Sequence, residues 1–261
     1  LKAEPLEEPS QGLSAKDRGS LLHDVLYRLW RQWDSSAALN ELTATALIDA
    51  LAKTISDCLN ELVPRYPILA GNRYRGIEQN RLEKLLSAWL ELEKQRPPFS
   101  VIDLECNRRI HFGDLEISLK LDRIDSVNGN LVVIDYKSGE VTASHWDGDR
   151  PKDPQLPLYL LASEPQANGC AFAQVKAGKI KFTGVSASDL IPEVKPLETW
   201  TAQVAQWEHA IGALAEEFTC GVAQVEVFDS GSFQFQSYLL PLNRWHEESD
   251  INTELLDKST Q

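Results

Sequence analysis

The 261-residue sequence contains no methionine, and its four cysteines form no CxxC pair. Scattered cysteines argue against a structural zinc site and a disulfide framework, so we expect reduced thiols in a cytoplasmic protein. No apolar run approaches the ~20 residues that a membrane-spanning helix needs, and we find no secretory signal. Because a protein of this size normally carries several methionines, we expect this chain to be a fragment of a longer protein.

Positive charge is also scarce. The chain has 26 Lys and Arg against 39 Asp and Glu, which gives a formal net charge of −13. The excess is uneven, because residues 216–261 hold nine acidic and only two basic side chains. Affinity for nucleic acid usually comes from a basic surface that neutralises phosphates. If this protein acts on DNA, we expect most of its non-specific affinity to come from another region or from a partner.

The stretch with the strongest structural signals runs from Leu119 to Gly139 and reads LKLDRIDSVNGNLVVIDYKSG. Apolar and polar residues alternate over 115–121, and a second apolar run occupies 131–137, which predicts two strands. Between them, Asn128-Gly129 is the strongest short-range indication of a two-residue hairpin turn, because both residues tolerate positive φ.

This turn predicts the register of the hairpin. Val127 then pairs with Asn130, and Asp122 falls opposite Asp135 with Cβ atoms roughly 4.5–5.5 Å apart. Lys137 shares the face of Asp135. Two facing carboxylates repel each other, and a divalent cation such as Mg²⁺ between them removes that penalty. Charged residues on a solvated sheet face need no function, however, so these three side chains alone leave both interpretations open.

Periodicity and punctuation by proline predict the other elements. We expect helices that include residues 22–33, 43–62, 77–94, 153–162 and 197–218, and strands over 100–112, 170–176 and 179–185. We divide the chain into a linker or disordered segment (1–13), a helical region (14–98), a core that carries the hairpin (99–220) and an acidic C-terminal extension (221–261).

Three motifs resemble those of one nuclease family. LKLDRID and IDYKSG, the two halves of the hairpin, are similar to motifs of the RecB-like branch of the PD-(D/E)XK nuclease superfamily, although Leu119 stands where the family has glycine. RGSLLHDVL, over 18–26, resembles the family motif R-G-x-x-x-H-x-x-L and contains His23. Taken alone, a histidine beside an apolar helical stripe is more often a packing or surface group. QLPLY, over 155–159, resembles the motif Q-L-x-x-Y.

The resemblance implies an α/β fold with a restriction-endonuclease-like mixed β-sheet flanked by helices and an N-terminal helical region. It implies a Mg²⁺- or Mn²⁺-dependent deoxyribonuclease, with exonuclease favoured over endonuclease, that acts in DNA repair or recombination. The expected substrate is DNA that is single-stranded at the cut site. A helicase-like region or subunit is the expected partner, and no membrane is involved.

The resemblance also implies which residues act at the site. The implied metal ligands are His23, Asp122, Asp135 and the backbone carbonyl of Tyr136. Lys137 is expected to orient or deprotonate the attacking water. Gln155 and Tyr159 are four residues apart on one helix face and are expected to position the strand. Glu105, in the strand over 100–112, corresponds to a glutamate of some family members, and a solvated strand carboxylate is an equally good interpretation.

The ligands of an iron–sulfur cluster are missing. The segment 217–227 resembles one that precedes a run of three cysteines in AddB-like nucleases, where the run helps to bind a [4Fe–4S] cluster. At the equivalent positions this chain has Gln234, Ser237 and Asn243. Because such clusters are held by thiolates, we expect none in this protein.

Two other functions are compatible with the sequence. The domain could be a non-catalytic DNA-binding or docking module of a helicase–nuclease complex, although the intact D…DxK and Q…Y patterns argue against a decayed site. It could also be an unrelated metal hydrolase of small phosphoesters, which would need a closed pocket and more acidic ligands. A Mn²⁺ titration tests the first alternative, and a comparison of a plasmid with a nitrophenyl phosphate ester tests the second.

Overall fold

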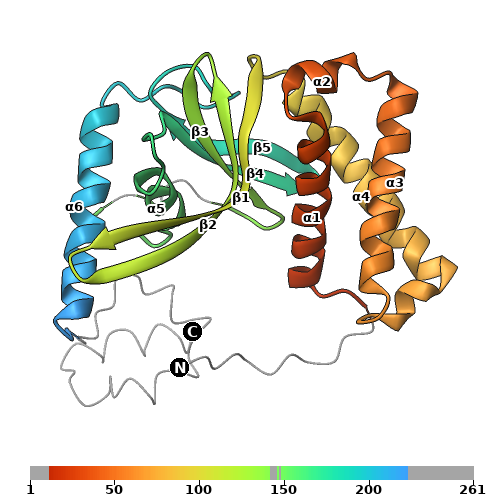
Figure 1. The fold of residues 1–261 in the computed structure, drawn as a ribbon, viewed down its shortest axis with the longest axis horizontal. Helices are drawn as coiled ribbons and strands as arrows, with labels where there is room; N and C mark the ends of the chain where they lie inside the picture. Colours follow the sequence, from red (N-terminus) through yellow and green to blue (C-terminus); the bar gives the residue numbers. More distant parts are fainter. Residues whose placement is uncertain (1–11, 142–145, 147, 223–261) are drawn as a thin grey trace, which may run out of the picture. The chain divides into compact units, whose positions relative to one another are not determined.

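The computed structural model describes residues 12–141, 146 and 148–222 (Figure 1). The chain divides into two compact units, Leu1–Ala215 and Glu216–Gln261. The first unit holds the elements that matter for function. In the second, the described residues complete the last helix and form a turn at Gly221.

Several predictions fall partly or wholly outside this described part. The expected linker over 1–13 lies outside it except for Gly12 and Leu13, and Leu13 is buried. The three positions that bear on an iron–sulfur cluster, Gln234, Ser237 and Asn243, also lie outside it. The proposed domain boundaries therefore stay a prediction.

Among the described residues, five helical segments precede the sheet. They are α1 (Ala15–Trp33), α2 (Ser36–Glu41), α3 (Ala44–Leu62), the short 3-10 helix η1 (Pro67–Ala70) and α4 (Asn72–Glu93). The helices expected over 22–33 and 43–62 are α1 and α3, whereas α4 begins five residues before its predicted start at residue 77. The sequence did not predict α2 and η1, because segments this short show no apolar period.

Side-chain caps determine where the first helices begin. The Ser14 side chain accepts a hydrogen bond from the Asp17 N–H at 3.1 Å, and Asp17 accepts one from the Ser14 N–H at 3.2 Å. This reciprocal pair is a capping box. Thr43 caps α3 by accepting from the Ala46 N–H at 3.1 Å. Because the cap fixes the start of α1, it also fixes the direction in which later residues of that helix point.

Five strands form one mixed sheet. They are β1 (Phe99–Phe112), β2 (Leu115–Val127), β3 (Asn130–Lys137), β4 (Gly169–Lys176) and β5 (Lys179–Ser186), and they lie side by side in this order. Only the β3–β4 pair is parallel, and the other three pairs are antiparallel. The expected mixed, mostly antiparallel sheet with an N-terminal helical region is therefore confirmed.

The predicted hairpin turn joins β2 to β3. Asn128 has φ of 51° and Gly129 has φ of 81°, as a two-residue hairpin turn with two positive φ angles requires. Val127 pairs with Asn130 as expected, and the ladder continues in the same register to the pair of Arg123 and Ile134. The ladder ends there, one pair before the expected partners Asp122 and Asp135. At this point β2 leaves β3.

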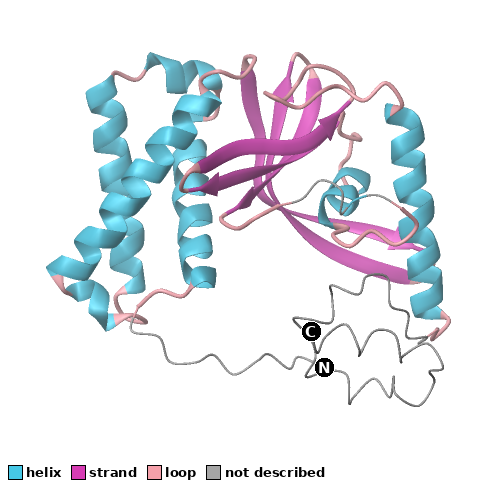
Figure 2. Ribbon diagram, turned by 180° about the vertical axis from the view of Figure 1, so that it is seen from behind, coloured by secondary structure: helices cyan, strands magenta, loops and turns pink. Residues whose placement is uncertain are grey.

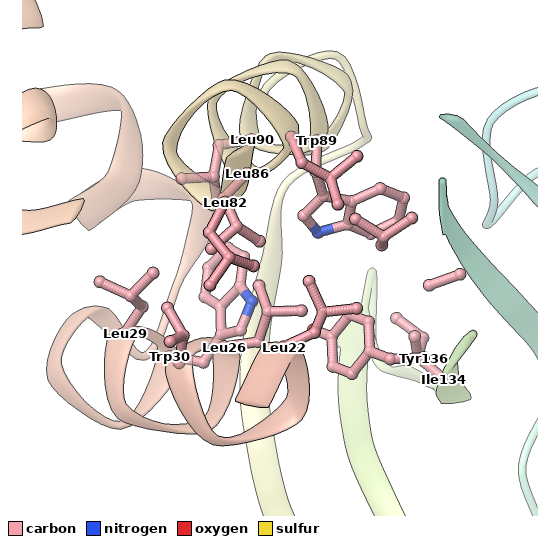
Figure 3. Packing of buried hydrophobic residues seen from close by; sticks show 14 of the residues in the cluster. Leu22, Leu26, Leu29, Trp30, Leu82, Leu86, Trp89, Leu90, Ile134 and Tyr136 are labelled. Atoms are coloured by element: carbon pink, nitrogen blue, oxygen red, sulfur yellow. The ribbon is translucent and has the colours of Figure 1, made fainter. Parts of the chain in front are cut away.

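Two hydrophobic cores cover the two faces of the sheet (Figures 1 and 2). On β3, Val132, Ile134 and Tyr136 belong to the core that includes α1, α3 and α4. Figure 3 shows the last two beside Trp89 and the leucines of α1. Val133 belongs to the second core. Because side chains alternate along a strand, the next odd-numbered residues of β3 share the face of Val133.

Two helices contribute to the second core, α5 (Gln155–Leu161) and α6 (Trp200–Thr219). The helix expected over 153–162 is α5, which begins two residues later than expected. The Asp153 side chain still accepts a hydrogen bond from the Gln155 N–H at 3.2 Å. None of the helices in the described part of the chain combines the length and the apolar character that crossing a membrane requires.

Candidate metal and active site

The end of the β2–β3 ladder exposes the backbone of Tyr136 to side chains from elsewhere. Its N–H donates a hydrogen bond to Asp122 Oδ2 at 2.8 Å. Its carbonyl oxygen lies 2.9 Å from His23 Nε2. A carbonyl can only accept, so Nε2 carries the proton and Nδ1 faces the site. The backbone N–H and carbonyl of one residue of β3 therefore orient two side chains that are 99 residues apart in the sequence.

His23 reaches this point because α1 passes close to the end of β3. A Cβ added at Gly19, one turn before His23, would lie 3.3 Å from Ser138 Oγ, which leaves little room for a larger residue. His23 Nδ1 lies 3.4 Å from Asp122 Oδ2. Burial acts to lower the pKa of His23, but the hydrogen bond and the charge of Asp122 outweigh it, and the pKa is raised. In the absence of another cation, this pair favours a proton on Nδ1.

Glu105 joins the same site from β1. The flanking pairs of the β1–β2 ladder, Leu104 with Arg123 and Cys106 with Leu121, place Glu105 across from Asp122. Its φ of 50° is a left-handed backbone conformation, which is uncommon for a residue other than glycine.

His23, Glu105 and Asp122 form a group that fits a metal ion. Each offers one ligand atom, and these atoms all lie within 4.8 Å of one another. The sequence left the role of Glu105 open. It gave no register for β1 against β2, and that register is the signal that would have placed Glu105 across from Asp122.

On the other side of Asp122, four predicted residues form a chain of contacts. Lys137 Nζ lies 2.7 Å from Asp135 Oδ2 and donates a hydrogen bond to Gln155 Oε1 at 2.6 Å. Gln155 Nε2 lies 2.7 Å from both Asp135 Oδ1 and the hydroxyl oxygen of Tyr159. The amide of Gln155 thus fixes the lysine and the carboxylate relative to each other. Burial raises the pKa of Tyr159 to about 12, so its hydroxyl stays neutral.

Asp135 is the most perturbed carboxyl group of the site. Its side chain is 2% exposed, and burial followed by the negative charge of Asp122 raises its pKa to about 7, although Lys137 and His23 act in the opposite direction. The geometry agrees with this influence, because Asp122 Oδ2 accepts a hydrogen bond from the N–H of Tyr136, the residue next to Asp135. No ladder pair joins Asp122 and Asp135, so their predicted face-to-face arrangement stays a prediction.

The donor set fits a divalent cation. Imidazole nitrogen and carboxylate oxygen are ligands that Mn²⁺ and, for the oxygens, Mg²⁺ accept. Asp135 Oδ2 is buried and receives no hydrogen bond within the described part of the chain, although Lys137 is close enough for an ion pair. Asp135 is not a member of the group of His23, Glu105 and Asp122, and the Tyr136 carbonyl is engaged by His23. Their roles as metal ligands stay predictions.

A cavity of about 620 Å³ opens onto this group. His23, Glu105 and Asp122 line it together with Tyr27 and Lys120. Arg123 and Asp125, the other charged residues of the D-R-I-D motif, do not line this cavity. Both are fully buried on the far side of β2, where they pair with each other.

One comparison with known proteins identifies the family of this chain. The model of the PD-(D/E)XK nuclease superfamily matches residues 1–237. The chain belongs to this superfamily, and its mixed sheet between helices is the α/β fold of restriction-endonuclease type. A comparison with the curated proteins found no match. The crystal structure of SSO0001 is similar over 63% of this chain and 83% of that chain, at 16% identity and a TM-score of 0.27.

Proposed function

We propose that this chain is the nuclease domain of a larger helicase–nuclease protein of the RecB-like branch, and that it hydrolyses phosphodiester bonds of DNA with Mg²⁺ or Mn²⁺. One observation supports this most. Ligand atoms of His23 from α1, Glu105 from β1 and Asp122 from β2 lie within 4.8 Å of one another. Asp122 also accepts a hydrogen bond from the Tyr136 N–H, next to Asp135 on β3. Isolated surface charges do not converge in this way.

The residues that would hold the ion are His23, Glu105 and Asp122, with Asp135 and the Tyr136 carbonyl as further predicted ligands. A bound divalent ion supplies a Lewis acid that neutralises charge on the phosphoryl oxygens and lowers the pKa of water. His23 can serve as a ligand because its Nε2–H is occupied by the Tyr136 carbonyl, which leaves Nδ1 for the ion.

Lys137 has the geometry of an orienting cation. An ammonium group has three N–H donors; that of Lys137 donates to Gln155 and forms an ion pair with Asp135, which accounts for two directions. The third is available for the attacking water or for a phosphate oxygen. Tyr159 contacts Gln155, and Gln155 contacts Lys137, so Tyr159 and Gln155 act by positioning the lysine. We propose that they also line the path of the strand.

The wider assignment rests on the motif resemblance and on charge. A net charge of −13 is compatible with a DNA enzyme whose affinity comes largely from a neighbouring helicase-like region or subunit. We propose an exonuclease of the cytoplasm that acts in repair or recombination on DNA that is single-stranded at the cut site.

Cleavage of a labelled single-stranded oligodeoxynucleotide by the full chain tests the proposal. We expect cleavage with Mn²⁺ or Mg²⁺ and none with EDTA. Asp122→Ala, Asp135→Ala and Lys137→Ala should each lower the rate by at least about 100-fold, the lower end of what one acid–base or charge-stabilising group contributes. Asp114→Ala, at the far end of the β1–β2 hairpin, is the matched control and should cleave normally. Circular dichroism checks that each variant folds.

The two alternatives give different results in the same series. A docking module would neither cleave nor bind Mn²⁺ in a titration of the unaltered chain. A hydrolase of small phosphoesters would turn over a nitrophenyl phosphate ester faster than the oligonucleotide. Full activity in any one of the three variants would overturn the role given to that residue.

A further inference from the structure

Lys120 is a basic side chain at the metal-binding cavity with no assigned role. It lies two residues before Asp122 on β2, and its Nζ forms an ion pair with Glu105 Oε2. Hydrogen bonding to Glu105 is the largest cause of its raised pKa, and the charge of Asp122 contributes. Its side chain is 60% exposed, whereas that of Glu105 is 24% exposed. Lys120 thus reaches from the cavity mouth to one member of the metal-binding group.

A divalent ion and Lys120 compete for the same carboxylate. The ion needs a Glu105 oxygen to complete the group with His23 and Asp122. A unit positive charge left on that carboxylate would lie a few ångströms from a doubly charged ion, and the repulsion is twice that between two unit charges. Lys120 is free to move, because its stem is flexible and its head is mostly in solvent. Binding of the ion should therefore release it.

The released ammonium group needs another acceptor, and Asp24, the further carboxylate of the cavity, is already paired with Arg28. The ammonium group carries donors only, so it binds an acceptor, and the acceptor that enters a nuclease site is a phosphate oxygen. Lys137 approaches from β3, where Asp135 and Gln155 hold it. Lys120 approaches from β2 at the rim of the cavity. The two lysines thus stand on different strands, on either side of Asp122.

We propose that Lys120 is a phosphate-binding residue that exchanges partners: it neutralises Glu105 in the metal-free protein and binds a backbone phosphate of the nucleic acid strand once a divalent ion takes Glu105. This inference rests on the proposed function and assigns a substrate contact to the same site. It predicts effects of opposite sign on metal affinity and on nucleic acid affinity, which a purely structural role for Lys120 would not produce.

The first measurement is Mn²⁺ binding to the full chain without nucleic acid, by calorimetry. Lys120→Gln removes the competing cation, so we expect Mn²⁺ to bind about two- to fivefold more tightly, the factor that corresponds to an exposed ion pair. Lys120→Arg keeps the charge and should bind as the unaltered chain does. Lys94→Gln is the matched control, because Lys94 forms an ion pair with Glu91 away from the cavity. It should leave Mn²⁺ affinity unchanged.

The second measurement is the salt dependence of binding to a fluorescent single-stranded oligodeoxynucleotide with Mn²⁺ present. The Asp135→Asn background is used so that the strand stays intact. Loss of one phosphate contact in Lys120→Gln should weaken binding and reduce the slope of log K against log salt by about 0.7. Lys120→Arg should restore the slope, and Lys94→Gln should not change it.

Each outcome decides a separate point. Unchanged or weaker Mn²⁺ binding by Lys120→Gln would overturn the competition. Tighter Mn²⁺ binding with an unchanged salt slope would overturn the phosphate contact. If the unaltered chain binds no Mn²⁺, the proposed function itself fails, and the inference fails with it.

Discussion

Neighbouring residues of β2 belong to two charged clusters with opposite properties. The closed cluster consists of Glu93, Arg96, Arg123, Asp125 and the Tyr136 hydroxyl. The open cluster consists of His23, Glu105, Asp122, Asp135 and Lys137. Asp122 and Arg123 are adjacent in the sequence, yet one enters each cluster.

The closed cluster balances its charges. Arg123 contacts Asp125 at 2.6 and 2.8 Å, Glu93 at 2.8 Å and the Tyr136 hydroxyl at 2.9 Å. Arg96 lies 2.7 Å from both Glu93 and Asp125. Two carboxylates thus meet two guanidinium groups, and all four charged side chains are fully buried. Such a network is favourable only while every member keeps its partners.

The open cluster leaves its charges unbalanced. Asp122 raises the pKa of Asp135, and Glu105 stands across from Asp122, so three carboxylates share the site with Lys137. Neighbouring carboxylates are unfavourable for stability. They are what a site that receives a cation requires. The comparison teaches that neighbouring residues of one motif can have opposite roles. Those in the closed cluster stabilise the fold, and the one in the open cluster is available to a cation.

The two clusters are linked through one residue. The hydroxyl of Tyr136 accepts a hydrogen bond from Arg123 in the closed cluster. The backbone N–H and carbonyl of Tyr136 hold Asp122 and His23 in the open cluster. Figure 3 shows its ring packed beside Trp89 in the first core. The buried ionic network and the apolar core therefore both fix the backbone that orients the metal-binding group.

The largest expected effect is on stability, and it should distinguish a substitution of Arg123 from one of Asp122. Arg123→Met leaves Asp125 and Glu93 with one guanidinium between them, and we expect a loss of about 3–5 kcal/mol in the free energy of unfolding. Asp122→Asn, one residue away, should keep the stability and lose the cleavage. Urea denaturation in EDTA measures the stability of both variants, and the oligonucleotide assay with Mn²⁺ measures their cleavage. Equal stability of Arg123→Met and the unaltered chain would show that the closed cluster contributes no net stability.

A smaller effect should appear in the pH dependence of stability. The pKa of Asp135 is about 7 in the folded protein and near 4 when unfolded. The folded chain therefore binds more protons between these values, and the metal-free protein becomes less stable as the pH rises from 4 to 7. Asp135→Asn removes this loss, so the free energy of unfolding of the variant should rise relative to that of the unaltered chain between pH 4 and pH 7. The relative gain is at most a few kcal/mol, because one pKa unit corresponds to about 1.4 kcal/mol.

The control for this measurement is Asp114→Asn, which should follow the unaltered chain at every pH. His23 acts in the same direction, because its raised pKa makes stability fall as the pH rises above its unfolded value. The difference between Asp135→Asn and the unaltered chain reports Asp135 together with its interaction with His23, because the charge of Asp135 helps to raise the pKa of His23. A difference that does not depend on pH would contradict the assigned pKa.

The smallest effect should concern the choice of metal. Imidazole favours Mn²⁺ over Mg²⁺, whereas carboxylates accept both. His23→Asn should therefore lower Mn²⁺ affinity by roughly tenfold and Mg²⁺ affinity by less, as measured by calorimetry. His111→Asn, on the exposed part of β1, is the control and should change neither affinity. An equal loss for both metals would mean that His23 acts through structure and not as a ligand.

Local signals in the sequence predicted much of the site. Asn128 and Gly129 predicted the turn and the register, and that register held down to Arg123. The spacing of Gln155 and Tyr159 predicted their shared helix face, and they form a hydrogen bond. These predictions succeed because turns and helix faces depend on residues a few positions apart.

Other parts of the site depended on distant segments and were not predictable in the same way. The place of Glu105 depends on the register of β1 against β2, which includes an irregularity between Val101 and Asp103. The ladder ends before Asp122 because the backbone N–H and carbonyl of Tyr136 form hydrogen bonds with the side chains of Asp122 and His23 and not with β2.

The sequence by itself determined the strands, the turn between them and the residue types of a metal site, since these depend on periodicity and on short-range backbone preference. The tertiary structure alone decided which charges are closed off and which stay open. Packing of α1 and α4 on one face of the sheet buried Arg123 with its partners and brought His23 to Asp122. Burial and charge balance are sums over segments far apart in the chain, so no local pattern encodes them.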